Sequence, residues 1–176
     1  MTENELRDLI QSWENLNIVS RHIADHPEYL GVLMSVALDD RKPENWRAVW
    51  MVEKVYDQYP DLIRPYLPAM TDFLFTTHNN SKKRHLLKLI SLNPIQEDQM
   101  GKLLNYGIET FTDASMPVAV RVHALQILFN ISLEEPDFAG ELIELIEHEL
   151  AYHDSAGIRS RGKHLLRKLY QLRKKS

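Results

Sequence analysis

The sequence contains no cysteine, and this absence excludes several kinds of site at once. Without thiols there is no disulfide framework, no thiolate zinc site and no cysteine nucleophile. Glycine and proline are also scarce, with six and eight residues among 176. The patterns GxGxxG and GxSxG, which mark nucleotide sites and nucleophile elbows, are missing as well. We therefore expect no cofactor, no catalytic residues and no enzyme activity.

Long hydrophobic runs are missing too. No apolar stretch approaches the roughly 18 residues that a membrane span needs. The polar start MTENELRDLI has no signal-peptide pattern. The composition, 44% hydrophobic and 26% charged, is ordinary for a globular protein. We expect one cytoplasmic domain of residues 1–176 that makes no membrane contact.

The net charge of −4 conceals a strong asymmetry along the chain. Residues 159–175 contain eight lysines and arginines and no acid. Residues 122–158 contain eight acids and neither lysine nor arginine. Charge is therefore sorted by segment, and each segment has to be interpreted by itself.

Apolar residues recur every three or four positions, as in ELIELIEHEL, and no segment alternates in the way strands do. The sequence therefore predicts an all-α fold. The prolines at 27, 60, 94 and 136 are each expected to begin a helix. Thr2 with Glu5, and Asn93 with Gln96, have the spacing of a capping box.

An internal repeat is visible in the arginines that follow the polar loops. Arg47, Arg84, Arg121 and Arg159 are separated by 37, 37 and 38 residues, and each lies near the start of an expected helix. Each arginine also follows an aspartate or asparagine by a few residues. The repeating element is a first helix, a turn, a second helix that begins at proline, and a polar loop.

The first-helix pattern in PVAVRVHALQIL resembles a HEAT repeat of the armadillo-like superfamily. The resemblance implies a right-handed α-α superhelix, or solenoid, of about four helical hairpins with a C-terminal capping helix. The expected repeats cover about 3–40, 43–78, 80–114 and 115–154, with a cap at 155–174. The first repeat is expected to be atypical, with its first helix broken near ENLN at 14–17.

The resemblance also implies a ladder in which an aspartate between repeats pairs with the first-helix arginine. The pairs expected from it are Asp40 with Arg47, Asp113 with Arg121, and Asp154 with Arg159. Arg84 belongs to the same series, but Asn80 occupies the position of its aspartate.

The second helices are the acidic part of the chain, and in such solenoids they line the concave face. Segments 27–40, 60–77, 94–113 and 136–154 contain fifteen acids and only two cations, Arg64 and Lys102. This pattern favours a non-catalytic scaffold or adaptor that binds a protein or peptide, plausibly a basic one. The candidate contact residues are Asp72, Glu109, Glu141, Glu144 and His148.

Nucleic-acid binding is the alternative, by analogy with HEAT-like DNA alkylation-repair proteins. It would use the basic last helix, through Arg159, Arg161, Lys163, Arg167 and Lys168. An acidic groove repels phosphate, which disfavours this alternative. A solvated face on the capping helix explains the same cations more simply. Homo-oligomerisation through the atypical first repeat is a third hypothesis.

Two further groups of residues have ordinary structural explanations. His22 and His26 are four residues apart, but a zinc site needs three or four convergent ligands, so we expect no metal. Trp46 and Trp50 are also four apart and are expected to fill the core of the second repeat. If either ring is exposed, it would mark a contact specific to that repeat.

Overall fold

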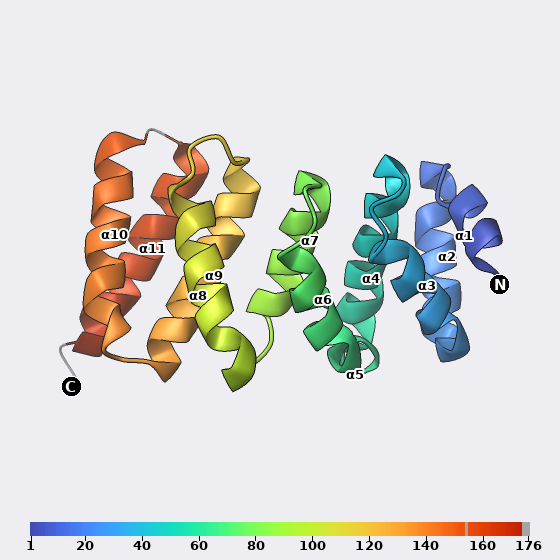
Figure 1. Ribbon diagram of the computed structural model, residues 1–176, viewed down its shortest axis with the longest axis horizontal. Coiled ribbons are helices and arrows are strands. Elements are labelled where there is room, and N and C mark those ends of the chain that lie inside the picture. The colour runs from blue at the N-terminus through green and yellow to red at the C-terminus, as the bar shows by residue number, and fades with distance from the viewer. Residues whose placement is uncertain (154, 174–176) are drawn as a thin grey trace. The chain divides into compact units, whose positions relative to one another are not determined.

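The computed structural model describes residues 1–153 and 155–173, and the elements among them are helices and turns without a strand (Figure 1). The all-α prediction is confirmed. The chain divides into two compact units, Met1–Asn93 and Pro94–Ser176, called here the first and the second unit. No helix of the described residues is long and apolar enough to cross a bilayer.

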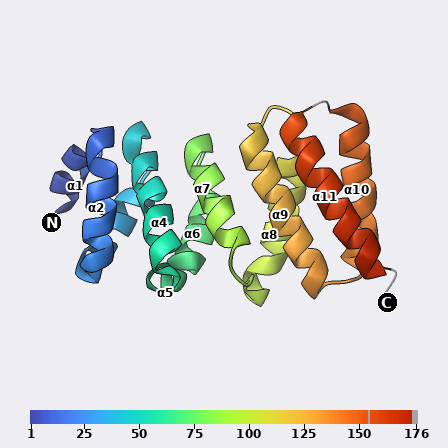
Figure 2. The same ribbon diagram turned by 180° about the vertical axis from the view of Figure 1, so that it is seen from behind.

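The first unit consists of short helix pairs. Its α-helices are α1 (Glu3–Leu9), α2 (Trp13–Asp25), α3 (Leu30–Ala37), α4 (Trp46–Gln58), α5 (Pro60–Ile63), α6 (Leu67–Leu74) and α7 (Asn80–Ser91). Within this unit α2, α4 and α7 lie in a row, with α4 in contact with both neighbours (Figure 2). On the other side, α3 packs on α4 and α6 packs on α7. First and second helices of the repeats therefore form two layers.

The second unit consists of longer helices. They are α8 (Glu97–Thr112), α9 (Val118–Glu134), α10 (Phe138–Tyr152) and α11 (Ala156–Arg173). Helix α9 contacts the three other helices, which explains why apolar residues occur on several of its sides. Gly107 allows α8 to approach α9 closely, because a Cβ at this position would lie 2.8 Å from Cδ2 of Leu128 on α9.

The helix ends agree only partly with the expected caps. Thr2 and Glu5 form the predicted capping box. Asn93 does not cap α8, which begins four residues later after Gln96. Instead, the Asn93 side chain donates to the Leu89 carbonyl and accepts from the Tyr56 hydroxyl. The predicted capping box of Asn93 and Gln96 is therefore not formed, and this prediction is wrong.

The prolines begin helical structure in two of the four expected places. Pro27 opens a 3₁₀ turn that leads into α3, and Pro60 is the first residue of α5. Pro94 and Pro136 instead precede α8 and α10 by three and two residues. The first repeat is not broken at ENLN, since α2 runs through these residues. The interruption lies at residues 10–12, between α1 and α2.

Candidate interaction surfaces

The joints between repeats in the first unit use different partners from those expected. Nζ of Lys82, on α7, lies 3.0 Å from Oδ1 of Asp40 and donates to the Asp39 carbonyl at 2.7 Å. Arg47 instead donates to the carbonyls of Ile10 and Gln11, at 2.8 and 2.6 Å. These contacts replace the expected pair of Asp40 and Arg47.

Lys82 is the buried cation of the third repeat. Its side chain has no exposed surface, whereas Arg84 is exposed. Burial lowers the pKa of Lys82, because the interior disfavours an ammonium charge, and the hydrogen bond to Asp40 opposes this effect. Arg84 is therefore not part of the ladder, and a lysine two residues earlier takes its place.

In the second unit the joint is a buried ion pair. Nη2 of Arg121 lies 2.6 Å from Oε2 of Glu149, and both side chains are almost fully buried. Nε of Arg121 also donates to the Phe111 carbonyl. The ion pair of Arg121 is thus with Glu149, while Asp113 accepts hydrogen bonds from Ser115.

The last expected pair of the ladder is Asp154 with Arg159. Arg159 is exposed on α11, and its expected partner Asp154 lies outside the described residues. Glu149 belongs to the acidic segment 136–154, but its carboxylate points inward and adds nothing to a binding surface. His153 Nε2 also approaches Glu149, at 3.3 Å.

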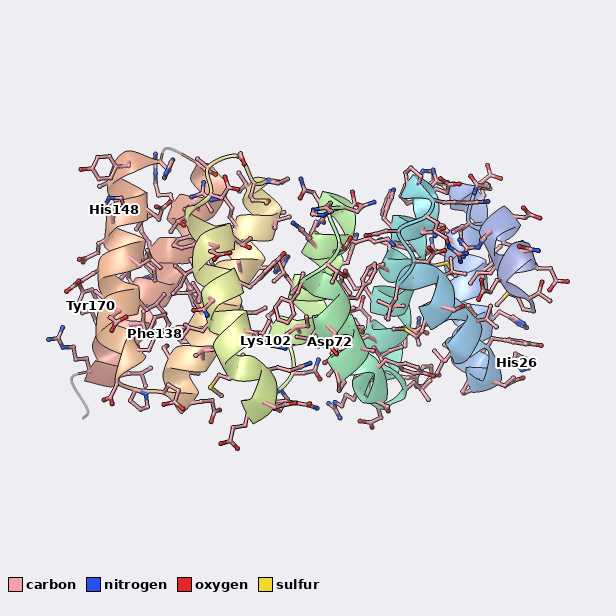
Figure 3. All side chains as sticks on the ribbon, in the orientation of Figure 1. His26, Asp72, Lys102, Phe138, His148 and Tyr170 are labelled. Carbon is pink, nitrogen blue, oxygen red and sulfur yellow. The ribbon has the colours of Figure 1, made fainter. Side chains whose placement is uncertain are left out.

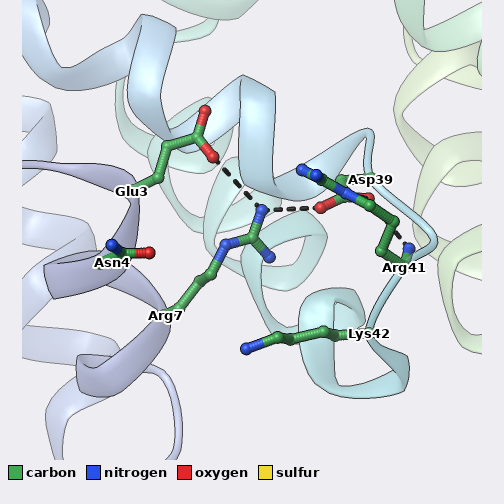
Figure 4. A pocket seen from close by; sticks show the side chains of 6 residues that line it. All are labelled: Glu3, Asn4, Arg7, Asp39, Arg41 and Lys42. Carbon is green, nitrogen blue, oxygen red and sulfur yellow. Dashed lines mark hydrogen bonds and ion pairs between the residues drawn. The ribbon is translucent and has the colours of Figure 1, made fainter.

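A further charged joint of the first unit holds α1 to the loop after α3, and it borders a small pocket (Figure 4). Arg7 donates to Asp39 at 2.7 Å, to Asn45 at 2.9 Å and to Glu3 at 3.4 Å. Hydrogen bonds from Arg41 and Arg7 hold the pKa of Asp39 well below its usual range, although burial opposes them.

The pocket itself has a volume of about 320 Å³. Its lining residues are Glu3, Asn4, Arg7, Asp39, Arg41 and Lys42. Because both of its acids are already bonded to arginine, the pocket is the outer side of a structural joint.

Glu53 forms the third buried charge cluster of the first unit, between α4 and α7. Its carboxylate lies 2.6 Å from Nδ1 of His85 and also pairs with Nζ of Lys88. Burial opposes the charge of Glu53, but the hydrogen bonds from His85 and Lys88 prevail and lower its pKa to about 2. Glu53 therefore stays ionised at neutral pH, and its contacts tie the second repeat to the third.

The three tryptophans of the chain form one cluster in the first unit. The ring of Trp13, on α2, lies 5.5 Å from Trp46 and 6.3 Å from Trp50 between centroids. Trp46 in turn stacks on His85 at 6.2 Å. Trp46 and Trp50 are half-buried, so they fill the core of the second repeat only in part, and Trp13 is 54% exposed.

The predicted acidic contact residues all lie at the surface. Asp72 is exposed on α6 of the first unit, and His148 is exposed near the end of α10 in the second (Figure 3). Glu109 is exposed on α8, and Glu141 and Glu144 are exposed on α10.

Within the second unit, α8 and α10 lie on the same side, toward the viewer in Figure 1. The exposed acids of these two helices are Glu97, Asp98, Glu109, Glu141, Glu144 and Glu147. Lys102 is their one exposed lysine or arginine. This surface, called here the acidic face, is therefore strongly negative.

Helix α11 presents the opposite charge. Arg159, Lys163, Arg167 and Lys168 are exposed, and Arg161 is half-buried with a hydrogen bond to Gln126 at 3.0 Å. Within the part of the chain that the structure describes, Lys163, Arg167 and Lys168 take part in no ion pair. Loss of hydration and the neighbouring cations Lys168, Arg167 and Arg161 lower the pKa of His164.

The histidines do not converge on a metal site. His22 and His26 lie 4.6 Å apart between ring centroids, and His22 stacks on Tyr29. Among residues 1–153 and 155–173, no group of three or more histidines, aspartates or glutamates is arranged to hold a metal ion.

Repeated two-layer helix pairs, joined by buried charges, define an α-helical repeat protein. The HEAT repeat domain family matches residues 2–169, and the chain belongs to this family. HEAT repeats commonly serve as protein-interaction scaffolds, and the family is generally non-catalytic. No curated protein and no solved structure matches the chain.

Proposed function

We propose that this protein is a non-catalytic scaffold that binds a basic segment of a partner protein through the second helices of its repeats. The observation that carries the proposal is the acidic face of the second unit, with six exposed acids against one lysine. Such a surface steers a cationic partner toward it and selects against anionic ones.

The side chains on α10 have the spacing that peptide recognition needs. Glu141, Glu144, His148 and Tyr152 follow one another at three or four residues, so they lie along one side of the helix. At 1.5 Å per residue this row is about 16 Å long, enough for about five residues of an extended peptide.

The row also ends in an aromatic anchor. Tyr152 is 73% exposed, and its ring packs against His148 at 4.6 Å between centroids. Interfaces draw much of their affinity from exposed tyrosine, tryptophan and arginine side chains. Carboxylates would provide orientation, and the Tyr152 ring would provide apolar contact.

Charge reversal on α10 tests the proposal. The probe is a fluorescent peptide of alternating lysine and leucine, titrated with the full chain at about 50 and 300 mM salt. We expect E141K/E144K to weaken binding about tenfold or more at low salt, with a smaller effect at high salt because screening reduces both affinities.

The matched control is E134K/E135K, because both acids are exposed but lie at the end of α9 and in the following loop. It carries the same change in net charge, and its affinity should stay within about twofold of the original. Equal weakening in the two variants would mean that only net charge matters, and the proposed surface would be wrong.

A second candidate function is nucleic-acid binding through α11, supported by Lys163, Arg167 and Lys168, which form no ion pair among residues 1–153 and 155–173. Phosphate contacts release counterions, so this binding would be strongest at low salt. A gel shift with duplex DNA at about 50 mM salt tests it, with K163E/R167E as the variant. No shift of the unmodified protein at low salt would dismiss this function.

A further inference from the structure

The tryptophan cluster has a feature that helix packing does not require. Trp13 leaves about half of its surface in water, whereas Leu16, Val19 and Ile23 on the same helix are buried. Ile18, on the same helix, is 69% exposed. Isolated apolar side chains at a surface are common, but a tryptophan that joins two further tryptophans and still faces solvent is typical of a contact site.

Cations accompany the rings. The guanidinium of Arg47 lies 5.1 Å from the centroid of Trp13, and Nζ of Lys54 lies 5.3 Å from that of Trp50. Arg21 on α2 and Arg84 on α7 are exposed, and neither forms an ion pair within the described residues. These helices form one row in the first unit (Figure 2).

Two of the acids nearby are engaged, whereas Glu14 and Asp25 on α2 are exposed. Glu53 is buried against His85 and Lys88, and Asp57 pairs with Lys54 at 3.3 Å. On α2, α4 and α7 the exposed or half-buried cations still outnumber the exposed acids: they are Arg21, Arg47, Lys54, Arg84 and Lys88 against Glu14, Asp25 and Asp57. This modest positive excess is opposite in sign to the acidic face.

An unpaired donor lies within the cluster. Nε of Arg47 is buried and has no hydrogen-bond partner, although its terminal Nη1 donates to two carbonyls. Buried donors without a partner are rare in folded proteins and call for a specific explanation. The Arg47 guanidinium lies against the half-exposed Trp13 ring, so this donor is beside the part of the cluster that faces solvent.

We propose that Trp13, Trp50 and Arg47 form a docking site for an acidic peptide segment that carries an aromatic or large aliphatic side chain. The apolar side chain packs on the exposed part of Trp13. A carboxylate beside it accepts from Nε of Arg47, and further acids of the segment face Arg21 and Arg84. The site is independent of the acidic face, since it lies in the other unit and selects the opposite charge.

A single-stranded nucleic acid also combines stacking with negative charge, but it fits this surface less well. It needs a continuous cationic track with several open rings. Here only Trp13 is widely exposed, and the exposed acids Glu14 and Asp25 lie on the same helix. A short acidic peptide can avoid those two carboxylates.

Intrinsic fluorescence provides a direct test, because all three tryptophans of the chain belong to the cluster. The probe is a nine-residue peptide of glutamates interrupted by two phenylalanines four residues apart. Its matched controls replace the glutamates by lysines, or the phenylalanines by serines. We expect a saturable change in tryptophan emission with the first peptide, and at least tenfold weaker binding of each control peptide.

Two sets of variants locate the binding. W13A should weaken the acidic peptide about tenfold or more, whereas W13F, which keeps an aromatic face, should stay within about threefold. R21E/R84E leaves every tryptophan in place and should also weaken binding about tenfold. This second variant, followed by fluorescence anisotropy of a labelled peptide, decides the matter if W13A does not fold.

Four results would overturn the proposal. They are no saturable change at millimolar acidic peptide, equal affinity for the lysine peptide, tighter binding of single-stranded DNA than of the peptide, and unaltered affinity in R21E/R84E. If concentration-dependent self-association, measured by analytical ultracentrifugation, alone explains the emission change, the occupant is a second copy of the chain and the proposal is likewise wrong.

Discussion

The two units join their helices by different buried charges, although the same residue spacing marks both. In the second unit Arg121 bonds a carboxylate and a backbone carbonyl at once, both in the interior. In the first unit the corresponding arginine is exposed, and Lys82 reaches a loop carbonyl and a half-exposed aspartate. An arginine can serve two fixed acceptors with its planar fork, whereas a lysine is a point charge on a flexible stem.

The difference predicts unequal sensitivity to mutation. Both side chains of the Arg121–Glu149 pair are almost fully buried, so the loss of Arg121 leaves the Glu149 carboxylate in the interior with only the neighbouring His148 and His153 to offset its charge. Around Lys82, Asp40 retains contact with solvent and can be hydrated when its partner is lost. The following predictions use this contrast, from the largest expected effect to the smallest.

Breaking the pair in the second unit should have the largest effect. We expect R121M to lower the free energy of unfolding by about 3–5 kcal/mol, because it strands the buried Glu149 carboxylate. Urea denaturation followed by circular dichroism measures the loss. The double variant R121M/E149L should recover a large part of it, since no buried charge is left unpaired. A loss below about 1 kcal/mol for R121M would contradict a buried, mutually dependent pair.

The sequence predicted the all-α class and the HEAT-like repeat, because helical periodicity and a recurring spacing are local properties of the chain. It could not predict the partner of Arg121. Glu149 lies 28 residues away, and only the packing angle of α9 and α10 decides whether it or Asp113 is reached.

Lys82 and Trp13 were missed for a related reason. The segment NNSKKRHLL reads as a solvated helix start, and nothing in it tells which cation turns inward. The sequence pattern does not relate Trp13 to Trp46, because a break at 14–17 would separate Trp13 from the following helix. The actual break at 10–12 places Trp13 at the start of α2, beside the start of α4.

Acid should weaken the first unit through Glu53. Its pKa falls from 4.5 to about 2 on folding, so the stabilisation is complete above about pH 4.5 and is lost as the pH falls toward 2. A shift of this size corresponds to about 3 kcal/mol as an order of magnitude. Urea midpoints between pH 6 and pH 3 should show about 2 kcal/mol of this loss, since the rest occurs below pH 3.

The control for this pH dependence is E53Q, which cannot ionise. It should be less stable than the unmodified protein at pH 6, and its midpoints should change less between pH 6 and pH 3. If both proteins lose stability equally over this range, the effect arises from other carboxylates.

Removing the ammonium of Lys82 should have the smallest effect of the three changes. Burial lowers the pKa of Lys82, so part of the strength of its hydrogen bonds is already offset by lost hydration. K82M keeps the length and packing of the stem, removes that desolvation penalty and leaves Asp40 open to water. We expect a loss of about 1–2 kcal/mol from the unpaired Asp39 carbonyl, clearly less than for R121M.

The control is R84M, at an exposed position of the same helix, whose free energy of unfolding should stay within about 0.5 kcal/mol of the original. If K82M lowered stability as much as R121M, hydration of the half-exposed Asp40 would not compensate for the loss of its partner. The two joints would then be energetically equivalent despite their different chemistry.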